Sequence, residues 1–234
     1  MSDSNDVPEK GMNPWGQAIS AVALVAALAL GFWALTKTQN ADGGAESKPA
    51  ACSGGAAQKG GKAADRVHGD ELCEALNRSD LAELLGTPGE TAKSASGNDE
   101  SSIGTGREKI ANPSARVEFA TYTVTLSATY DKLPVGDSAV LLGQDGQLRK
   151  VLGRPGAFYS TQTMKIGFRL DGSDATSAPG VPARVLDVAL DAEDKGGSYE
   201  LALWRSDGGV PDDATLLQIA ETVLPRIPGW SAAG

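Results

Sequence analysis

An uncharged apolar run constrains this chain more than any other feature of the sequence. Residues 18–35 read AISAVALVAALALGFWAL, and 16 of these 18 residues are hydrophobic. As an α-helix the run would be about 27 Å long, which is close to the thickness of a bilayer core. Aromatic side chains at the ends of such a run prefer the membrane interfaces. We therefore predict a single transmembrane helix over residues 18–36, with Trp15, Phe32 and Trp33 as its interfacial anchors.

The alternative for this run is a cleaved secretory signal. A signal has a basic amino-terminal region and a small-residue cleavage site after its apolar part. Here Asp3, Asp6 and Glu9 outnumber Lys10 before the run, and no good cleavage triplet follows Leu35. These features favour an anchor that is retained in the mature chain.

Small residues recur at intervals of four along the predicted anchor. Ala23, Ala27 and Gly31 would lie on one helix face, where they could allow two helices to pack closely. Alanine is so frequent in this run that the same spacing also arises without any partner helix.

The orientation of the anchor depends on the cysteines, because the basic residues on its two sides nearly balance. Lys10 precedes the run, while Lys37 and Lys48 follow it. Cys52 and Cys73 are the only cysteines, and a disulfide between them would stabilise the fold by about 3 kcal/mol. Two free thiols, or a lipid-modified Cys52, are the alternatives. A disulfide persists outside the cytoplasm, so we expect a cytoplasmic amino terminus and an external carboxyl-terminal domain.

The chain therefore divides into four segments. We predict a cytoplasmic tail over 1–17, the anchor over 18–36, a flexible Gly/Ala/Lys spacer over 37–65 and an extracytoplasmic domain over 66–234. The spacer contains no large apolar residue and has nothing to bury. The domain holds 16 basic and 24 acidic residues, a net charge of -8 out of the chain's -9. This acidic balance argues against a nucleic-acid partner.

The domain begins and ends with helical patterns. Leucines at helical spacing over 72–85 predict two short helices, with Ser79 as the cap between them. A short helix is also expected over 137–142. Pro211 and Asp212 should start a final amphipathic helix that extends to Ile227.

Between these helices the sequence alternates with a period of two. The clearest strand covers 121–130, where Thr and Ser side chains alternate with Tyr, Val, Leu and Ala. Further strands are expected over 164–170, 186–190 and 199–203, with one over 148–159 that is broken at 153–156. We expect a bulge near Ala120 and a polar loop over 91–114. The predicted fold class is α+β, a two-layer antiparallel sheet with flanking helices.

Several pieces of this sequence resemble an actinobacterial family of uncharacterised single-pass membrane proteins, whose outer region is a domain of unknown function. The pieces are LCEAL at 72–76, LLGTP at 84–88, TVTLSATYDKLP at 123–134, VLGRPGAFYS at 151–160, LWR at 203–205 and VLPRIPGW at 223–230. A more distant similarity connects the chain to actinobacterial envelope lipoproteins, which form small α+β sandwiches but carry a lipobox in place of the anchor. Neither resemblance supplies catalytic residues.

Motifs for chemistry are sparse. His68 is the only histidine and lies at the end of the spacer, so no catalytic triad is expected. The acidic segment 191–196 has a lysine at a ligand position of a calcium loop and is better explained as a hairpin turn. We expect no metal, no cofactor and no catalytic constellation. Arg154 is the one candidate for ligand binding, because an arginine at a strand turn can meet a carboxylate or a phosphate; the alternative is an arginine held by backbone carbonyls.

The layout of anchor, spacer and domain predicts a membrane-anchored binding module at the outer surface, attached to the lipid bilayer through 18–36 and meeting an unknown protein or small ligand. One alternative is an envelope hydrolase that uses paired carboxylates, which would show a cleft with a raised pKa on one acid. Another is a regulatory partner of a second membrane protein, acting through the anchor.

Overall fold

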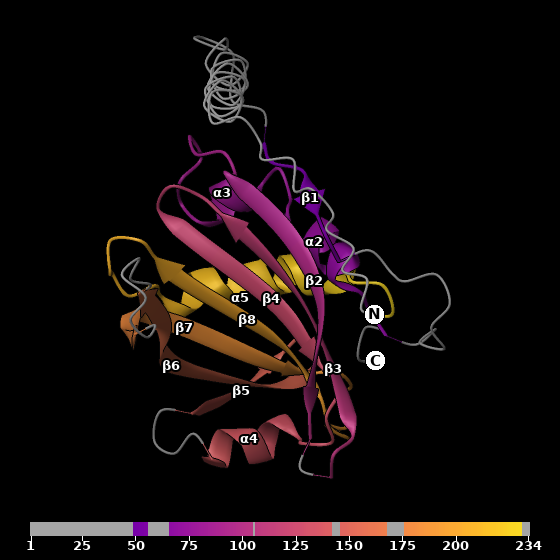
Figure 1. Cartoon of the computed structure of the whole chain (residues 1–234). Coiled ribbons are helices and arrows are strands. Elements are labelled where there is room, and N and C mark those ends of the chain that lie inside the picture. Colours follow the sequence, from indigo (N-terminus) through magenta and orange to yellow (C-terminus); the bar gives the residue numbers. More distant parts are fainter. Residues whose placement is uncertain (1–48, 56–65, 105, 142–145, 168–175, 231–234) are drawn as a thin grey trace, which may run out of the picture. The chain divides into compact units, whose positions relative to one another are not determined.

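The computed structural model describes residues 49–55, 66–104, 106–141, 146–167 and 176–230 (Figure 1). The predicted transmembrane helix lies outside these ranges, and so do its interfacial aromatic residues and its small-residue face. None of the helices within the described ranges is long and apolar enough to cross a membrane.

An eight-stranded sheet forms the centre of the folded unit, in the order β1-β2-β3-β4-β8-β7-β6-β5. The strands are β1 Cys52–Ser53, β2 Ser94–Ile103, β3 Lys109–Glu118, β4 Tyr122–Thr129, β5 Gln147–Val151, β6 Arg154–Gly167, β7 Thr176–Ala189 and β8 Ser198–Arg205. Every neighbouring pair is antiparallel except β1 and β2, which are parallel. The predicted α+β class is confirmed, but the sheet is mixed and not purely antiparallel. The parallel strand comes from residues 49–55, which the sequence places in the spacer.

The helices distribute unequally over the two faces of the sheet. They are α2 Gly69–Leu76, α3 Leu81–Leu84, α4 Val135–Leu141, α5 Asp213–Val223 and the 3-10 turn η2 Leu224–Arg226. One face is covered by α2, α3 and α5, which bury the main core against the strands. Among the described helices, α4 alone packs on the other face, at one end, over a small cluster that includes Ala157 and Ala189 (Figure 1). No other described helix covers this second face, which we call the open face.

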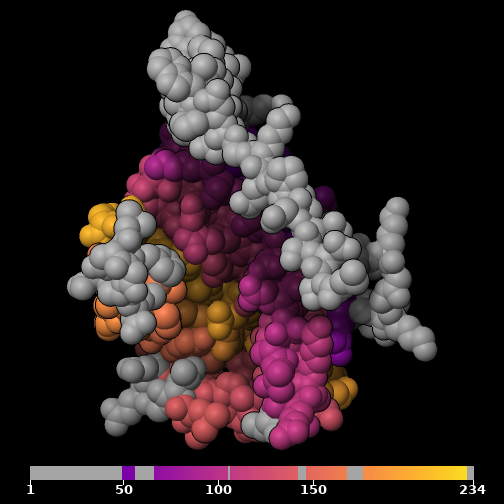
Figure 2. Space-filling view, viewed as in Figure 1, coloured from indigo at the N-terminus to yellow at the C-terminus, as the bar shows by residue number. Residues whose placement is uncertain are grey.

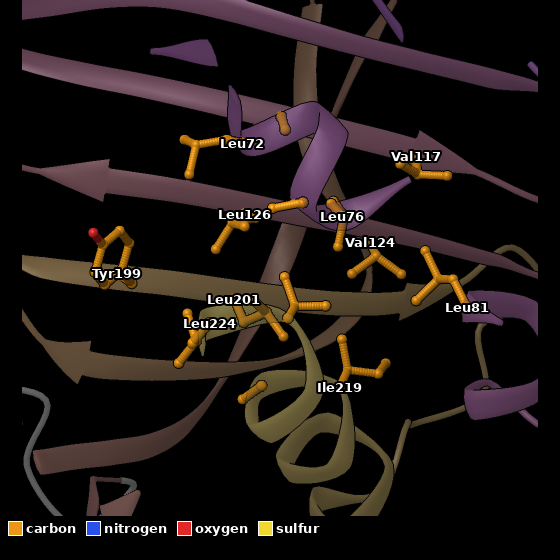
Figure 3. Close-up of a cluster of buried hydrophobic side chains, with 14 of the residues drawn as sticks. Leu72, Leu76, Leu81, Val117, Val124, Leu126, Tyr199, Leu201, Ile219 and Leu224 are labelled. Carbon is orange, nitrogen blue, oxygen red and sulfur yellow. The ribbon is translucent and has the colours of Figure 1, made fainter. Parts of the chain in front are cut away.

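The main core follows directly from the alternation in β4. Val124, Leu126 and Ala128 are fully buried, whereas the Thr and Ser residues between them point to the open face. Leucine side chains from α2 and β8 and apolar side chains from α5 and η2 pack on this row (Figure 3). Burying one leucine of this kind stabilises the fold by roughly 1.5–3 kcal/mol.

The predicted polar loop over 91–114 is wrong, because this segment forms β2 and most of β3. The two strands pair continuously from Ser94 with Glu118 to Ile103 with Lys109. Most side chains of β2 are exposed, so the strand has no apolar periodicity by which the sequence could reveal it. The backbones of β2 and α2 approach so closely that only glycine fits between them, because a Cβ added at Gly97 would overlap the backbone of Gly69.

Two further predicted irregularities are hairpin turns. The expected bulge near Ala120 is a tight turn from β3 to β4, in which the Phe119 N–H donates to the carbonyl of Tyr122. The break at 153–156 is a turn whose residues Leu152 and Gly153 both have positive φ, so that β6 starts at Arg154. From there β6 is continuous to Gly167 with one irregularity near 162–164, whereas the sequence suggested two separate strands.

Helix capping follows the sequence at the last helix but not between α2 and α3, where Asp80 and not Ser79 is the N-cap. At α5 the N-cap is Asp212, as predicted, and its Oδ1 accepts a hydrogen bond of 2.7 Å from the Thr215 N–H. The helix ends at Val223, where η2 with Pro225 takes over.

Replacing Asp212 with alanine is expected to lower the free energy of unfolding by about 1 kcal/mol, because the first turn of α5 loses this acceptor. Urea unfolding followed by pulse proteolysis of the full-length chain would measure the loss. Asp212→Asn is the matched control, since its amide oxygen can still accept the bond. An equal loss in both variants would show that the charge of Asp212, and not the hydrogen bond that it accepts, stabilises the helix start.

Candidate functional site

The open face of the sheet is the candidate site, and its composition follows from strand parity. Thr123, Thr125 and Ser127 lie on this face of β4, opposite the buried row. The cross-strand register places Trp204, Ala202 and Glu200 of β8 beside them, and β7 and β6 continue the same face. The face therefore offers hydroxyl, aromatic and charged groups where the opposite face is apolar.

A groove of about 460 Å³ runs along this face. Figure 2 shows the hollow between the magenta β2–β3 hairpin and the orange strands β6 and β7. Its volume falls in the range of small-molecule sites. The polar and aromatic residues that line it include Arg116, Thr125, Tyr159, Thr161, Glu200 and Trp204.

At one side of the groove a cation lies over an aromatic ring. The guanidinium of Arg116 is 5.2 Å from the centre of the Trp204 ring. The same guanidinium forms an ion pair with Glu118, with 2.5 Å between Nη2 and Oε1. The hydrogen bonds that Glu118 accepts from Ser94 and Arg116 outweigh its partial burial and lower its pKa. The negative charge of Glu118 is thus balanced by the guanidinium of Arg116.

Two further carboxylates lie next to each other on this face, and neither forms an ion pair with a described basic residue. Asp187 on β7 and Glu200 on β8 are direct cross-strand partners, so their side chains emerge next to each other. The Tyr159 hydroxyl donates a 3.1 Å hydrogen bond to Glu200 Oε2 from the other side of β7. Only 9% of the Asp187 surface is exposed, and its buried Oδ1 has no hydrogen-bond partner among the residues that the structure describes.

Burial and neighbouring charge shift the ionisation of this cluster. Burial, together with the negative charges of Glu200 and Asp131, raises the pKa of Asp187 to about 7. Burial also raises the pKa of the Tyr159 hydroxyl, as do the charges of Asp187 and Glu200. Asp187 consequently exchanges its proton near neutral pH. Such a group can donate a hydrogen bond when protonated and can accept a cation when ionised.

The comparisons with known proteins give a family without a known activity. A model described as a family of unknown function, DUF6215, matches residues 9–145, which is more than half of the chain. The chain belongs to the DUF6215 family. No curated protein and no solved structure matches it significantly.

The part matched to DUF6215 contains β1 to β4 and α4, and with them Arg116 and Thr125 of the groove. The strands that carry Tyr159, Asp187 and Glu200 lie beyond the matched range. Most of the residues that line the groove of this DUF6215 chain therefore come from strands after the matched range.

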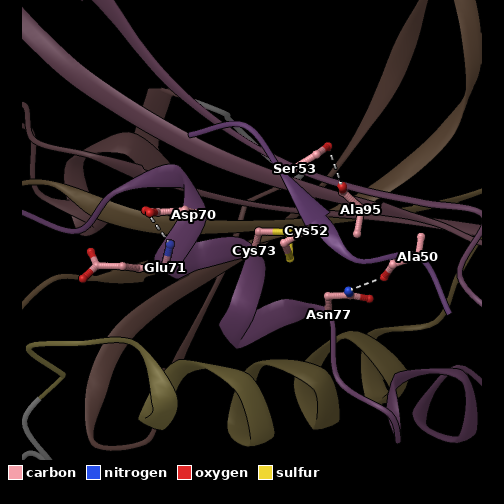
Figure 4. The surroundings of a disulfide bond; sticks show 8 residues. All are labelled: Ala50, Cys52, Ser53, Asp70, Glu71, Cys73, Asn77 and Ala95. Atoms are coloured by element: carbon pink, nitrogen blue, oxygen red, sulfur yellow. Dashed lines mark hydrogen bonds between the residues drawn. A yellow bond between two sulfur atoms is a disulfide. The ribbon is translucent and has the colours of Figure 1, made fainter. Parts of the chain in front are cut away.

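The predicted disulfide between Cys52 and Cys73 is confirmed, with Cα atoms 5.9 Å apart. It ties β1 to α2, as Figure 4 shows. Two hydrogen bonds support this connection: Asn77 donates to the carbonyl of Ala50, and the Ser53 hydroxyl donates to the carbonyl of Ala95. The disulfide thus fastens the short edge strand β1 to α2, the first helix that the structure describes.

Arg154, the predicted ligand-binding candidate, lies on the helix-covered side and not in the groove. Its guanidinium is 3.5 Å from the centre of the Trp230 ring and donates to the carbonyl of Leu190. Only 2% of the residue is exposed, and this burial lowers the pKa of the guanidinium. These contacts favour a structural role for Arg154, and ligand binding by it stays a prediction.

The other sequence motifs have local structural roles. His68 is the N-cap residue of α2, and its Nδ1 lies 3.2 Å from the carboxylate of Asp99. In the acidic segment, Asp191 accepts hydrogen bonds from the N–H groups of Glu193 and Lys195, as in a hairpin turn. No group of three or more metal-ligating side chains occurs among the residues that the structure describes.

The strands predicted over 186–190 and 199–203 contain Asp187 and Glu200, but the sequence pattern did not bring the two acids together. One signal was present: both acids lie on strands joined by the Gly-rich turn that ends at Gly197. The Leu190 N–H donates to the Gly197 carbonyl, and this fixes the register that makes Asp187 and Glu200 neighbours. Choosing that register from the sequence would have required knowing where the turn closes.

Proposed function

We propose that this protein is a membrane-anchored binding module that displays the grooved face of its sheet outside the cytoplasm. The observation that carries the proposal is the unequal coverage of the sheet. Three helices and a 3-10 turn seal one face, while the other keeps an open groove whose polar and aromatic lining contributes nothing to the main core. A lining of this kind suits a polar ligand that is recognised by hydrogen bonds and ring contacts.

The proposed location rests on two features. The uncharged run over 18–36 is long enough for one membrane span, and it attaches the protein to the lipid bilayer. The disulfide between Cys52 and Cys73 belongs to an oxidising compartment, which supports a cytoplasmic amino terminus and an external domain. The resemblance to actinobacterial single-pass proteins and envelope lipoproteins agrees with this placement. The partner in this proposal is a protein or small ligand of the cell surface.

Site-specific photo-crosslinking in intact cells tests the binding face. A photoreactive amino acid at Thr125, in the groove, should give adducts with an envelope component in the full-length protein. The same amino acid at Glu221, an exposed residue of α5 on the opposite layer, is the matched control. Each adduct would be identified by mass spectrometry, which detects both small and macromolecular partners.

The proposal predicts adducts at Thr125 that become several-fold weaker when Trp204→Ala removes the aromatic wall of the groove. Equal adducts from Thr125 and Glu221, or adducts from Glu221 alone, would contradict the assignment of the open face as the binding surface.

A second candidate function is carboxylate-based hydrolysis of an envelope polymer. The specific observation in its favour is the neighbouring pair Asp187 and Glu200, because burial brings the pKa of Asp187 to about 7, as a general acid requires. Hydrolysis predicts release of soluble fragments from isolated cell walls by the full-length protein, abolished by Asp187→Asn and by Glu200→Gln. Binding to walls without any fragment release would exclude it.

A further inference from the structure

We infer that the groove on the open face binds a neutral oligosaccharide, whose sugar rings lie against the aromatic side chains of the groove. This inference rests on the proposed binding function and names the class of ligand that the groove would hold. Its support is the chemistry of the residues that line the groove: their apolar floor, their unused polar groups and their balance of charge.

The floor of the groove is made of small apolar residues. Ala183, Val185 and Ala202 line it and are buried, yet they belong to neither of the two apolar clusters that pack against the helices. The rings of Tyr159 and Trp204 line the same groove. A sugar ring presents a face of C–H groups, and these are attracted to the negative faces of aromatic rings. The floor and the two rings therefore suit a ligand with flat apolar faces.

Polar groups with unused hydrogen-bonding capacity surround this floor. Glu200 Oε2 accepts a 3.1 Å bond from the Tyr159 hydroxyl, while no described residue donates to Glu200 Oε1. The side-chain hydroxyls of Thr125 and Thr161 form no hydrogen bond within the described part of the chain. A ligand hydroxyl can donate to the carboxylate and can both donate to and accept from a threonine. A purely apolar ligand would bury these groups without partners, which is unfavourable.

The charges in the lining favour a neutral ligand over an anion. Among the described residues that line the groove, only Arg116 and Glu200 are charged, and their charges cancel. The Arg116 guanidinium already lies 2.5 Å from a carboxylate oxygen of Glu118 and 5.2 Å from the centre of the Trp204 ring. It is therefore not free to hold the carboxylate or phosphate of a ligand.

A peptide strand fits the groove less well than a saccharide does. The groove lies over β4, β8, β7 and β6, whose backbones pair with one another. A peptide that adds to a sheet needs the free N–H and C=O groups of an edge strand, and these central strands offer none. Recognition in the groove must therefore come from side chains, which is how sugar hydroxyls and sugar rings are bound.

The groove is also longer than a single sugar ring. Its lining extends from Thr125 on β4 to Thr161 on β6, which is three strand spacings or about 14 Å. The hollow between the β2–β3 hairpin and strands β6 and β7 is visible in Figure 2. A short chain of sugar units therefore fills the groove better than a monosaccharide.

The test uses the full-length protein in micelles of lauryldimethylamine oxide, a detergent without a sugar headgroup, and observes ligands by saturation-transfer NMR. The neutral probes are maltotriose, cellotriose and triacetylchitotriose. Trigalacturonic acid is the anionic counterpart, and deacetylated chitotriose is the cationic one. At least one neutral trisaccharide should bind about tenfold more tightly than glucose and than either charged trimer, because the lining offers no unpaired charge pair to compensate a charged ligand.

Trp204→Ala should weaken binding of that trisaccharide about tenfold, whereas Trp204→Phe should keep most of the affinity because an aromatic ring remains. Thr161→Val preserves the shape of the side chain but removes the hydroxyl, and it should weaken binding several-fold. Thr222→Val makes the same change on α5, in the opposite layer, and is the matched control that should bind as the wild type does. Pulse proteolysis of every variant separates loss of binding from loss of folding.

Several results would overturn the inference. Absence of binding by all three neutral trisaccharides, or binding that survives both Trp204→Ala and Thr161→Val, would remove the groove from saccharide recognition. Tighter binding of either charged trimer would show that charge, and not rings and hydroxyls, selects the ligand. Equal affinity for glucose would exclude a chain as the ligand. If Thr125 forms specific adducts in cells while no trisaccharide binds, the inference fails and the proposed function stands; if both experiments fail, neither stands.

Discussion

Replacing Asp187 with asparagine is expected to raise the free energy of unfolding at pH 8 by on the order of 3 kcal/mol. The folded pKa of Asp187, about 7, is raised above the value of 3.8 that the carboxyl has when it is solvated. Between these values the folded chain keeps a proton that the unfolded chain releases. Wild-type stability therefore falls as pH rises from about 4 to about 7, and the loss remains at higher pH.

Pulse proteolysis in urea at pH 4, 6 and 8 would measure this effect on the full-length chain. The asparagine variant should match the wild type at pH 4 and exceed it at pH 8. Glu118→Gln is the opposing control: the pKa of this carboxylate is lowered, so its removal should not stabilise the protein at pH 8. An Asp187→Asn variant that is no more stable than the wild type at pH 8 would show that Asp187 is not buried as described.

Removing the disulfide by Cys52→Ala should lower the free energy of unfolding by about 3 kcal/mol, because the unfolded chain regains the freedom of a loop of 21 residues. Cys52 is preferable to Cys73, which is fully buried in the core and would leave a cavity as well. Reductant should destabilise the wild type by a similar amount and should leave Cys52→Ala unchanged.

Ser53→Ala is the control for this variant, since it removes one hydrogen bond from the same strand and should cost about 1 kcal/mol or less. Thiol labelling in intact cells adds a test of the compartment. An external domain predicts that neither cysteine reacts with a maleimide before reduction. Free thiols in cells, or a wild type that is insensitive to reductant, would contradict both the disulfide and the proposed orientation.

The sequence predicted the elements whose burial is one-sided. In β4 the alternation of Thr and Ser with Val, Leu and Ala identified the strand, its buried row and its solvated row. At α5 an N-cap aspartate and an apolar stripe identified the helix start. In each case polar residues face water and apolar residues face the core, so the period of the strand or helix appears as an alternation of polar and apolar residues in the sequence.

The sequence missed the elements that are held by pairing alone. The strand β2 is polar along most of its length, and its strand geometry comes from ten backbone pairs with β3. The sequence did not indicate the two-residue strand β1, because its surroundings have the composition of a spacer and β1 is held by the disulfide, by pairing with β2 and by hydrogen bonds to distant residues. Backbone hydrogen bonds do not depend on side-chain type, and they leave no pattern in the sequence.

The same distinction applies to the candidate site. By itself the sequence determined that the chain has an apolar run, a spacer without large apolar residues, an acidic α+β domain and a pair of cysteines that can form a disulfide, since these follow from residue type and spacing. Only the tertiary structure decided that α2, α3 and α5 cover one face and leave a groove on the other. It also decided that Asp187 and Glu200 are cross-strand neighbours and that Tyr159 bonds to Glu200. Strand register and helix placement are set by packing across the whole sheet, and thirteen positions separate these two acids along the chain. The fold, and not any local stretch of sequence, therefore makes these two acids neighbours and raises the pKa of Asp187.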